Sequence, residues 1–139
     1  MDIFNSLDEL GLNSTNSVII GSGILNALLI RNCNDIDVVV NYETYQELGK
    51  NDRFIKAQNH GLEVLTDGLF EIGTSWNILG RSHSFKDLQN HHSVIIDGVC
   101  YITLEFLLAI KESWLNGNDV RQKDIDDVRL IKEYRNGNI

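Results

Sequence analysis

The chain has 139 residues, of which 42% are hydrophobic and 23% are charged, a composition typical of a soluble globular protein. Its length is close to the commonest domain size, so we expect a single domain, residues 1–139, with one core. No segment approaches the roughly 20 apolar residues of a membrane span. The net charge of −8 disfavours a long nucleic acid as a partner, because clustered Lys and Arg side chains bind phosphates.

The lack of a secretory signal pattern and the low cysteine content favour the cytoplasm. The first residues, Met1-Asp2-Ile3-Phe4-Asn5, lack the basic region and apolar run of a secretory signal. The two cysteines, Cys33 and Cys100, show neither the density of a disulfide scaffold nor the close spacing of a zinc site. We therefore expect a cytoplasmic protein whose thiols are reduced.

Hydrophobic periodicity divides the chain into alternating helices and strands. In chain order we predict a helix at residues 2–10, a strand at 18–20, a helix from Ile24 through Leu29, a strand at 36–40, a helix at 42–49, a hairpin of strands 62–66 and 69–72, a second hairpin of strands 93–96 and 99–102, and helices at 103–115 and 120–135. This order predicts a small mixed β-sheet backed by helices, an α/β or α+β layer structure with two C-terminal helices.

Glycine-containing turns and one apolar stripe support these assignments. Asp67-Gly68 and Asp97-Gly98 separate the strands of the two hairpins, and Asp-Gly favours a two-residue turn because both positions tolerate positive φ. In the last helix we expect Ile125, Val128, Ile131 and Tyr134 to form one side and charged residues to form the other.

Asp35 and Asp37 form the first candidate site. Side chains alternate along a strand, so both aspartates point to one face, with Cα atoms about 6.6 Å apart at the usual strand rise. Two carboxylates at this spacing can close onto one Mg²⁺ ion, which prefers oxygen ligands and retains substrate phosphates in its shell. The alternative is that both carboxylates are simply solvated at the exposed start of the strand.

The second candidate site is Gly21-Ser22-Gly23, where a predicted strand meets a predicted helix. Free backbone N–H groups at such a junction attract phosphate, and glycine allows a close approach. The alternative is that Ser22 is only the N-cap of the following helix and the glycines make a tight turn.

Together these features resemble the nucleotidyltransferase superfamily, which includes DNA polymerase beta and the antibiotic nucleotidyltransferases. The matching residues are Ile20-Gly21-Ser22, Arg31 and Asn34-Asp35-Ile36-Asp37-Val38-Val39-Val40. The resemblance implies that Gly21 and Ser22 bind a nucleoside triphosphate. It also implies that Asp35 and Asp37 bind two Mg²⁺ ions and that a later strand supplies a third carboxylate.

Glu71 is our preferred third carboxylate, because it lies in the apolar strand that leads into Gly73-Thr74-Ser75-Trp76. Glu63 is its competitor. A non-functional explanation of Glu71 is that it is a charge on an edge strand, which discourages aggregation.

The C-terminal sequence continues the resemblance to small stand-alone bacterial nucleotidyltransferase-like proteins. Its matching segments are Asp97-Gly98-Val99, the stretch from Ile102 to Lys111, and Arg121-Gln122-Lys123-Asp124-Ile125-Asp126-Asp127. Lys123 and Lys111 are candidates for neutralising the triphosphate, with Asp124 and Asp127 positioning them. The alternative is an ordinary helical salt bridge, since Lys123 and Asp127 are four residues apart.

The remaining candidates for chemistry are histidines and tryptophans. No pair among His60, His83, His91 and His92 has the i, i+4 spacing of a helical metal site, so we expect these histidines at the surface. Trp76 and Trp114 are expected in the core or an interface.

The sequence therefore predicts a Mg²⁺-dependent enzyme that transfers a nucleoside monophosphate from an NTP to an acceptor hydroxyl. Glu71 or a neighbouring residue is expected to assist as general base, and the charge favours a small molecule, a protein side chain or a structured RNA as acceptor. One alternative is a catalytically inactive binding module of the same fold, acting beside a protein partner of the toxin–antitoxin type. Another is a plain interaction domain of unrelated α/β fold.

Overall fold

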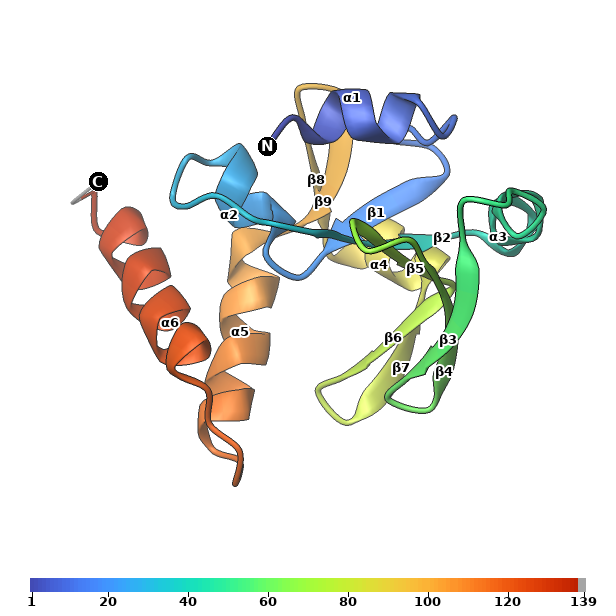
Figure 1. Ribbon diagram of the computed structural model, residues 1–139. Helices are drawn as coiled ribbons and strands as arrows, with labels where there is room; N and C mark the ends of the chain where they lie inside the picture. The colour runs from blue at the N-terminus through green and yellow to red at the C-terminus, as the bar shows by residue number, and fades with distance from the viewer. Residues whose placement is uncertain (138–139) are drawn as a thin grey trace.

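The structure is a computed structural model that describes residues 1–137 (Figure 1). Its elements are α1 (Ile3–Asp8), β1 (Ser17–Ile20), α2 (Gly23–Ala27), β2 (Ile36–Val40), α3 (Tyr42–Leu48), β3 (Ile55–Asn59), β4 (Leu62–Thr66), β5 (Phe70–Gly73), β6 (Ser75–Ile78), β7 (Arg81–Ser84), α4 (Phe85–His91), β8 (Ser93–Ile96), β9 (Val99–Ile102), α5 (Leu104–Leu115) and α6 (Gln122–Arg135).

A mixed sheet with strand order β3-β4-β5-β2-β1-β9-β8 organises the fold, and β6 and β7 form a separate two-stranded ribbon. Strand β2 is antiparallel to β1 and parallel to β5, so the strands that carry Asp37 and Glu71 are neighbours. This arrangement confirms the predicted mixed sheet with helices and the two helices at the C-terminal end.

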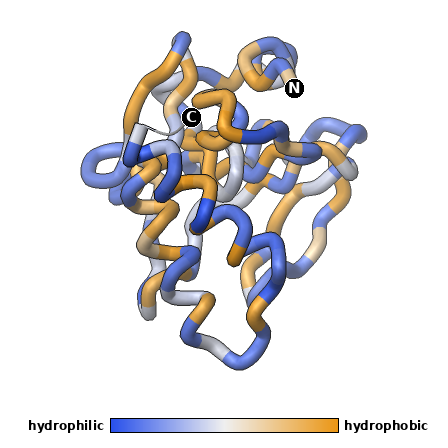
Figure 2. The backbone as a smooth tube through the Cα atoms, turned by 90° about the vertical axis from the view of Figure 1, so that its left-hand side faces the viewer, coloured by the Kyte–Doolittle hydropathy of each residue, from blue (hydrophilic) through white to orange (hydrophobic). Residues whose placement is uncertain are grey.

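The core lies around the central strands, where Val18, Ile19, Val38, Val39 and Ile72 are almost completely buried. Helix α4 packs against strands β1, β7, β8 and β9. Helices α5 and α6 pack against one another beside the sheet. Loops at the rim of the molecule are mostly hydrophilic (Figure 2). Within residues 1–137 no helix is long and apolar enough to cross a membrane.

Both predicted hairpins form, but their turns differ. Asp97 and Gly98 both have positive φ, 50° and 80°, as the two-residue turn requires. At the first hairpin only Gly68 has positive φ. The carboxylate of Asp67 instead accepts hydrogen bonds from the backbone N–H groups of Leu69 and Phe70.

The predictions for the apolar faces of α2 and α6 were partly wrong. Helix α2 ends at Ala27, and Leu29 has φ of 59° and is 88% exposed, so the apolar stripe does not continue. On α6, Val128 and Ile131 are buried as predicted, but Ile125 is exposed. The buried side of α6 contains two aspartates, described below, because oppositely charged side chains meet them there.

Strands β3, β6 and β7 and helix α4 were not predicted. Strand β3 is largely exposed and lacks a β-branched run, and the ribbon of β6 and β7 is mostly polar. Its turn uses Leu79 at φ 54°, a conformation that leucine rarely adopts. Helix α4 did carry a signal, since Ser84 caps the backbone N–H of Asp87 three residues later.

Candidate active site

Strands β2 and β5 bring Asp37 and Glu71 side by side in parallel register. Asp35 lies just before β2 and is exposed, whereas Asp37 is half-buried. Burial, followed by the negative charges of Asp35 and Glu71, raises the pKa of Asp37 to about 7, against an opposing effect of Lys123. Asp37 is therefore not simply solvated, because it lies in an excess of negative charge that a cation would relieve, whereas Asp35 is exposed.

The turn after β1 lies directly against Asp37. Gly21 has φ of 63°, and a Cβ atom on it would be 3.1 Å from Oδ2 of Asp37. A side chain at Gly21 would thus be strained and would crowd the carboxylate. Gly23 is required for a different reason, since a Cβ there would lie 2.2 Å from Cγ2 of Ile19. Gly21 therefore keeps backbone, rather than a side chain, beside the carboxylate, and Gly23 allows α2 to pack against Ile19.

Ser22 precedes α2, but its side chain makes no capping hydrogen bond. Its Oγ accepts a hydrogen bond of 2.9 Å from Nη2 of Arg31. Arg31 also donates from Nε and Nη2 to the two carboxylate oxygens of Asp127, at 2.6 and 2.8 Å. The explanation of Ser22 as only an N-cap is therefore wrong, because its hydroxyl connects the Gly-Ser turn to α6 through Arg31.

A buried ion network joins α5 to α6. Nζ of Lys111 lies 2.8 Å from Asp124 Oδ1 and 2.9 Å from Asp127 Oδ2, and all three side chains are at most 3% exposed. Burial would raise the pKa of Asp127, but hydrogen bonds from Arg31 and Lys111 hold the pKa below its usual range. The aspartates thus position Lys111, as expected. Its proposed contact with a triphosphate is not compatible with this burial.

Lys123 is exposed in the first turn of α6. It does not pair with Asp127, which binds Arg31 and Lys111 instead, so the helical salt bridge considered above is not formed. The positive charge of Lys123 acts on Asp37. Lys123 is therefore the lysine that the fold leaves available near the carboxylates.

The two glutamates considered as third carboxylate lie in different surroundings. Glu71 is on β5, an interior strand, so the edge-strand explanation of its charge is wrong. Its Oε1 accepts a hydrogen bond of 2.8 Å from Asn59. Glu63 accepts a hydrogen bond of 2.7 Å from the Tyr45 hydroxyl beside a cavity of about 270 Å³. Glu71, rather than Glu63, is the neighbour of Asp37.

The donor set of Asp35, Asp37 and Glu71 suits Mg²⁺ in chemistry, because hard cations prefer carboxylate oxygen. The three carboxylates are not closed as tightly as a preformed site. Within residues 1–137, the one group of three or more His, Cys, Asp or Glu residues whose ligand atoms lie within 4.8 Å of one another consists of His83, Asp87 and His92. An ion at the carboxylates would therefore draw the side chains together.

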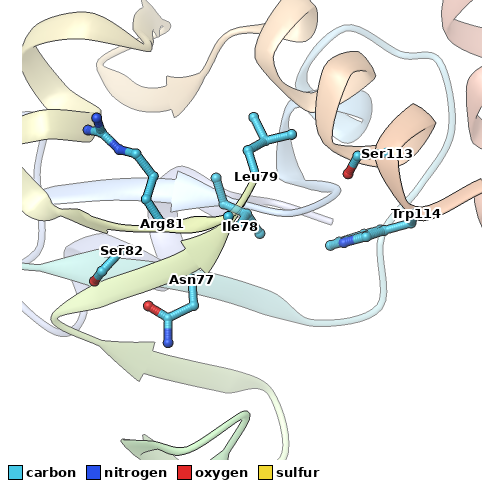
Figure 3. Close-up of a pocket in the computed structure, with 8 residues that line it drawn as sticks. Asn77, Ile78, Leu79, Arg81, Ser82, Ser113 and Trp114 are labelled. Carbon is cyan, nitrogen blue, oxygen red and sulfur yellow. The ribbon is translucent and has the colours of Figure 1, made fainter. Parts of the chain in front are cut away.

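A widely open cavity of about 800 Å³ lies between the β6–β7 ribbon and the end of α5. Figure 3 shows Trp114 extending from α5 toward Asn77 and Ile78. None of the candidate carboxylates lines this cavity. Trp114 is thus a cavity wall rather than a core residue, whereas Trp76 packs against the core as expected.

The prediction that all four histidines lie at the surface was wrong for His83. His60 and His91 are exposed as expected, but His83 is only 4% exposed. Nδ1 of His83 lies 2.5 Å from Oδ2 of Asp87, four residues later. A pattern of paired histidines does not include this contact, since the i, i+4 partner of His83 is an aspartate on α4.

The fold is similar to solved nucleotidyltransferase structures. The antibiotic-resistance factor ANT(2'')-Ia, in complex with adenylyl-2''-tobramycin, superimposes with a TM-score of 0.56 at 16% identity over 98% of this chain and 87% of that one. Its solution structure gives a TM-score of 0.54 at 16% identity over 98% of this chain and 82% of that one. No protein-family model and no curated protein sequence matches the chain. The chain therefore has the nucleotidyltransferase fold.

Proposed function

We propose that the protein is a Mg²⁺-dependent nucleotidyltransferase that transfers a nucleoside monophosphate from an NTP to an acceptor hydroxyl and releases pyrophosphate. One observation carries this proposal. Asp37 lies between Glu71 on the neighbouring strand and the Gly21 backbone, and burial together with the negative charges of Asp35 and Glu71 raises its pKa to about 7. A site with this excess of negative charge favours a divalent cation beside a phosphate-binding turn.

Asp35, Asp37 and Glu71 would hold the metal, with two ions as the expected number. Bound metal would supply activation of the acceptor oxygen and stabilisation of the leaving phosphate oxygen. Gly21 and Ser22 would present backbone N–H groups to the triphosphate, and the exposed Lys123 would neutralise part of its charge. Arg31 acts as a positioning residue, because it holds Ser22 against α6.

ANT(2'')-Ia, with which the chain shares its fold, was solved bound to an adenylylated antibiotic. This supports a hydroxylated small molecule as one class of acceptor for the present chain. The negative charge of the chain agrees with it, since a polyanionic acceptor would be repelled.

The first test measures the thermal midpoint of unfolding with ATP, GTP, CTP and UTP, each with and without Mg²⁺. A ligand that binds only the folded state raises this midpoint. We expect at least one nucleotide to raise it only with Mg²⁺, and we expect Asp35→Asn and Asp37→Asn to abolish the shift. Asp52→Asn, at an exposed aspartate in a turn, is the matched control and should behave like the wild type.

The second test follows transfer of an α-phosphate label from the NTP that binds to hydroxylated acceptors in a cell extract. Asp37→Asn should reduce transfer by roughly 1000-fold, because metal stabilisation of the transition state is worth several kcal/mol. Retained transfer in both aspartate variants would eliminate the mechanism. Metal-dependent nucleotide binding without any transfer would instead support the inactive binding module.

A further inference from the structure

A second cluster of metal-ligating side chains lies away from the three carboxylates. It consists of His83 on β7, Asp87 in the first turn of α4 and His92 at the end of the same helix. One ligand atom from each residue lies within 4.8 Å of the other two. The three residues lie within one ten-residue segment, in which β7 runs directly into α4. We call them the His83–Asp87–His92 cluster.

The buried histidine of this cluster is incompletely satisfied. Its Nδ1 is paired with Asp87, but Nε2 is buried and has no hydrogen-bond partner within residues 1–137. A buried polar atom without a partner is costly, and such atoms are rare in native proteins. The hydrogen bond to Asp87 therefore explains only half of the imidazole. A metal ion bound at Nε2 of His83 would give this atom the partner that it lacks.

Aromatic packing already fixes the two imidazole rings. The ring of His92 stacks on Phe106 of α5, with centroids 4.0 Å apart and planes at 13°. The ring of His83 meets the same phenyl ring edge-on at 5.5 Å. Rings held in this way lose little conformational entropy when they bind an ion, which is the usual advantage of a preorganised site.

We propose that the His83–Asp87–His92 cluster is a Zn²⁺ site, distinct from the carboxylate site on β2 and β5. Two imidazoles and one carboxylate are a donor set for zinc, whereas Mg²⁺ prefers oxygen ligands alone. Zinc–ligand bonds of about 2.0–2.2 Å place tetrahedral ligand atoms roughly 3.3 Å apart. Ligand atoms now within 4.8 Å reach that separation through small side-chain movements. Three protein ligands leave a fourth position for water.

Zinc at this position would hold the β6–β7 ribbon against α4. Arg81 and Ser82, which line the open cavity beside Trp114, immediately precede His83. The ion would thus fix one wall of that cavity, opposite Trp114. The site is independent of the proposed catalytic metal, and its test requires no nucleotide and no acceptor.

The full chain, freed of metal with a chelator, is titrated with Zn²⁺ by calorimetry and with Co²⁺ by visible absorption. We expect one Zn²⁺ ion per chain at this site, the strong d–d bands of four-coordinate Co²⁺, and no displacement by excess Mg²⁺. Absence of stoichiometric Zn²⁺ binding to the folded protein overturns the proposal.

Two nearly isosteric variants, Asp87→Asn and His92→Gln, test the ligands, with circular dichroism as the check of folding. Each should weaken Zn²⁺ binding by about 100-fold, since even residues that only orient metal ligands contribute 10- to 100-fold. His91→Gln, at the exposed neighbouring histidine, should leave binding unchanged. Asp37→Asn should also retain the Zn²⁺ site, which separates this inference from the proposed function. Unchanged Zn²⁺ affinity in both folded ligand variants, or its loss in Asp37→Asn, contradicts the assignment.

Discussion

Two regions of the molecule bury aspartate side chains with opposite consequences. At the junction of α5 and α6, Asp127 is 1% exposed but lies between Arg31 and Lys111, and its pKa is held below the usual range. In the sheet, Asp37 is less buried but is surrounded by other carboxylates, and its pKa is raised to about 7. Burial alone therefore does not distinguish a structural carboxylate from one that we propose to bind metal. The sign of the neighbouring charges does.

The largest expected contrast is in stability. Asp127→Asn leaves Lys111 and Arg31 with an uncompensated positive charge, and breaking a buried pair from one side typically costs about 3–5 kcal/mol. Asp37→Asn removes a charge that its neighbours already disfavour, so the free energy of unfolding without metal should stay the same or rise. Urea denaturation of both variants in the presence of a chelator measures the difference.

The measured stabilities also test whether Asp127 is the structural carboxylate and Asp37 is not. An Asp37→Asn variant that loses as much stability as Asp127→Asn would mean that the carboxylate in the sheet is structural. Arg129→Gln provides the surface control, because the exposed pair of Arg129 and Glu133 should contribute at most about 1 kcal/mol.

The second contrast concerns Arg31, which joins the two regions. Arg31→Lys keeps the positive charge but loses the planar fork that reaches Asp127 and Ser22 together. The Gly-Ser turn would then be released from α6, and we expect nucleotide affinity to fall about tenfold, equivalent to about 1.4 kcal/mol. The shift of the thermal midpoint over an NTP–Mg²⁺ titration measures this change.

Arg53→Lys is the matched control, since Arg53 pairs with Asp67 at the first hairpin, away from the Gly-Ser turn. Equal loss of nucleotide affinity in both variants would argue against Arg31 as a positioning residue. A loss of stability in Arg31→Lys without any change in nucleotide affinity would confine Arg31 to the buried ion network.

The sequence predicted the carboxylate strand well and the buried ion network poorly. The β-branched run from Ile36 to Val40 located β2 and Asp37, because a buried central strand has a strong local pattern. The ion network was only partly visible. Its contact between Arg31 and Asp127 spans 96 residues, and a buried aspartate on a helix has the same local pattern as an exposed one.

The cluster around His83 was missed for a related reason. Strand β7 and helix α4 are short and polar, and the buried ring of His83 packs edge-on against Phe106, which is distant in sequence. Hydrophobic periodicity describes which face of an element is apolar, but not which polar residue the tertiary fold covers. The Ser84–Asp87 capping pattern would have located α4, though not the metal ligands.

The smallest predicted effect is an acid dependence that belongs to the helix pair. The pKa values of Asp124 and Asp127 are lowered in the folded state, because hydrogen bonds from their basic partners outweigh the effect of burial. In the unfolded chain these aspartates have pKa values of about 3.9, so they take up protons there before they do so in the folded protein as the pH falls. The stabilisation is complete above that value and is lost as the pH drops through the lower folded-state values, by at most about 1.4 kcal/mol per pH unit for each proton.

Urea denaturation from pH about 6 to about 3 should thus show wild-type stability falling more steeply in acid than that of Asp127→Asn, which has one fewer of these groups. Asp52→Asn, at an exposed aspartate, should retain the wild-type slope. If Asp127→Asn lost stability at neutral pH yet kept the full acid slope, Asp127 would not be the linked proton site. The negative half of the ion network would then have to be assigned to Asp124 alone.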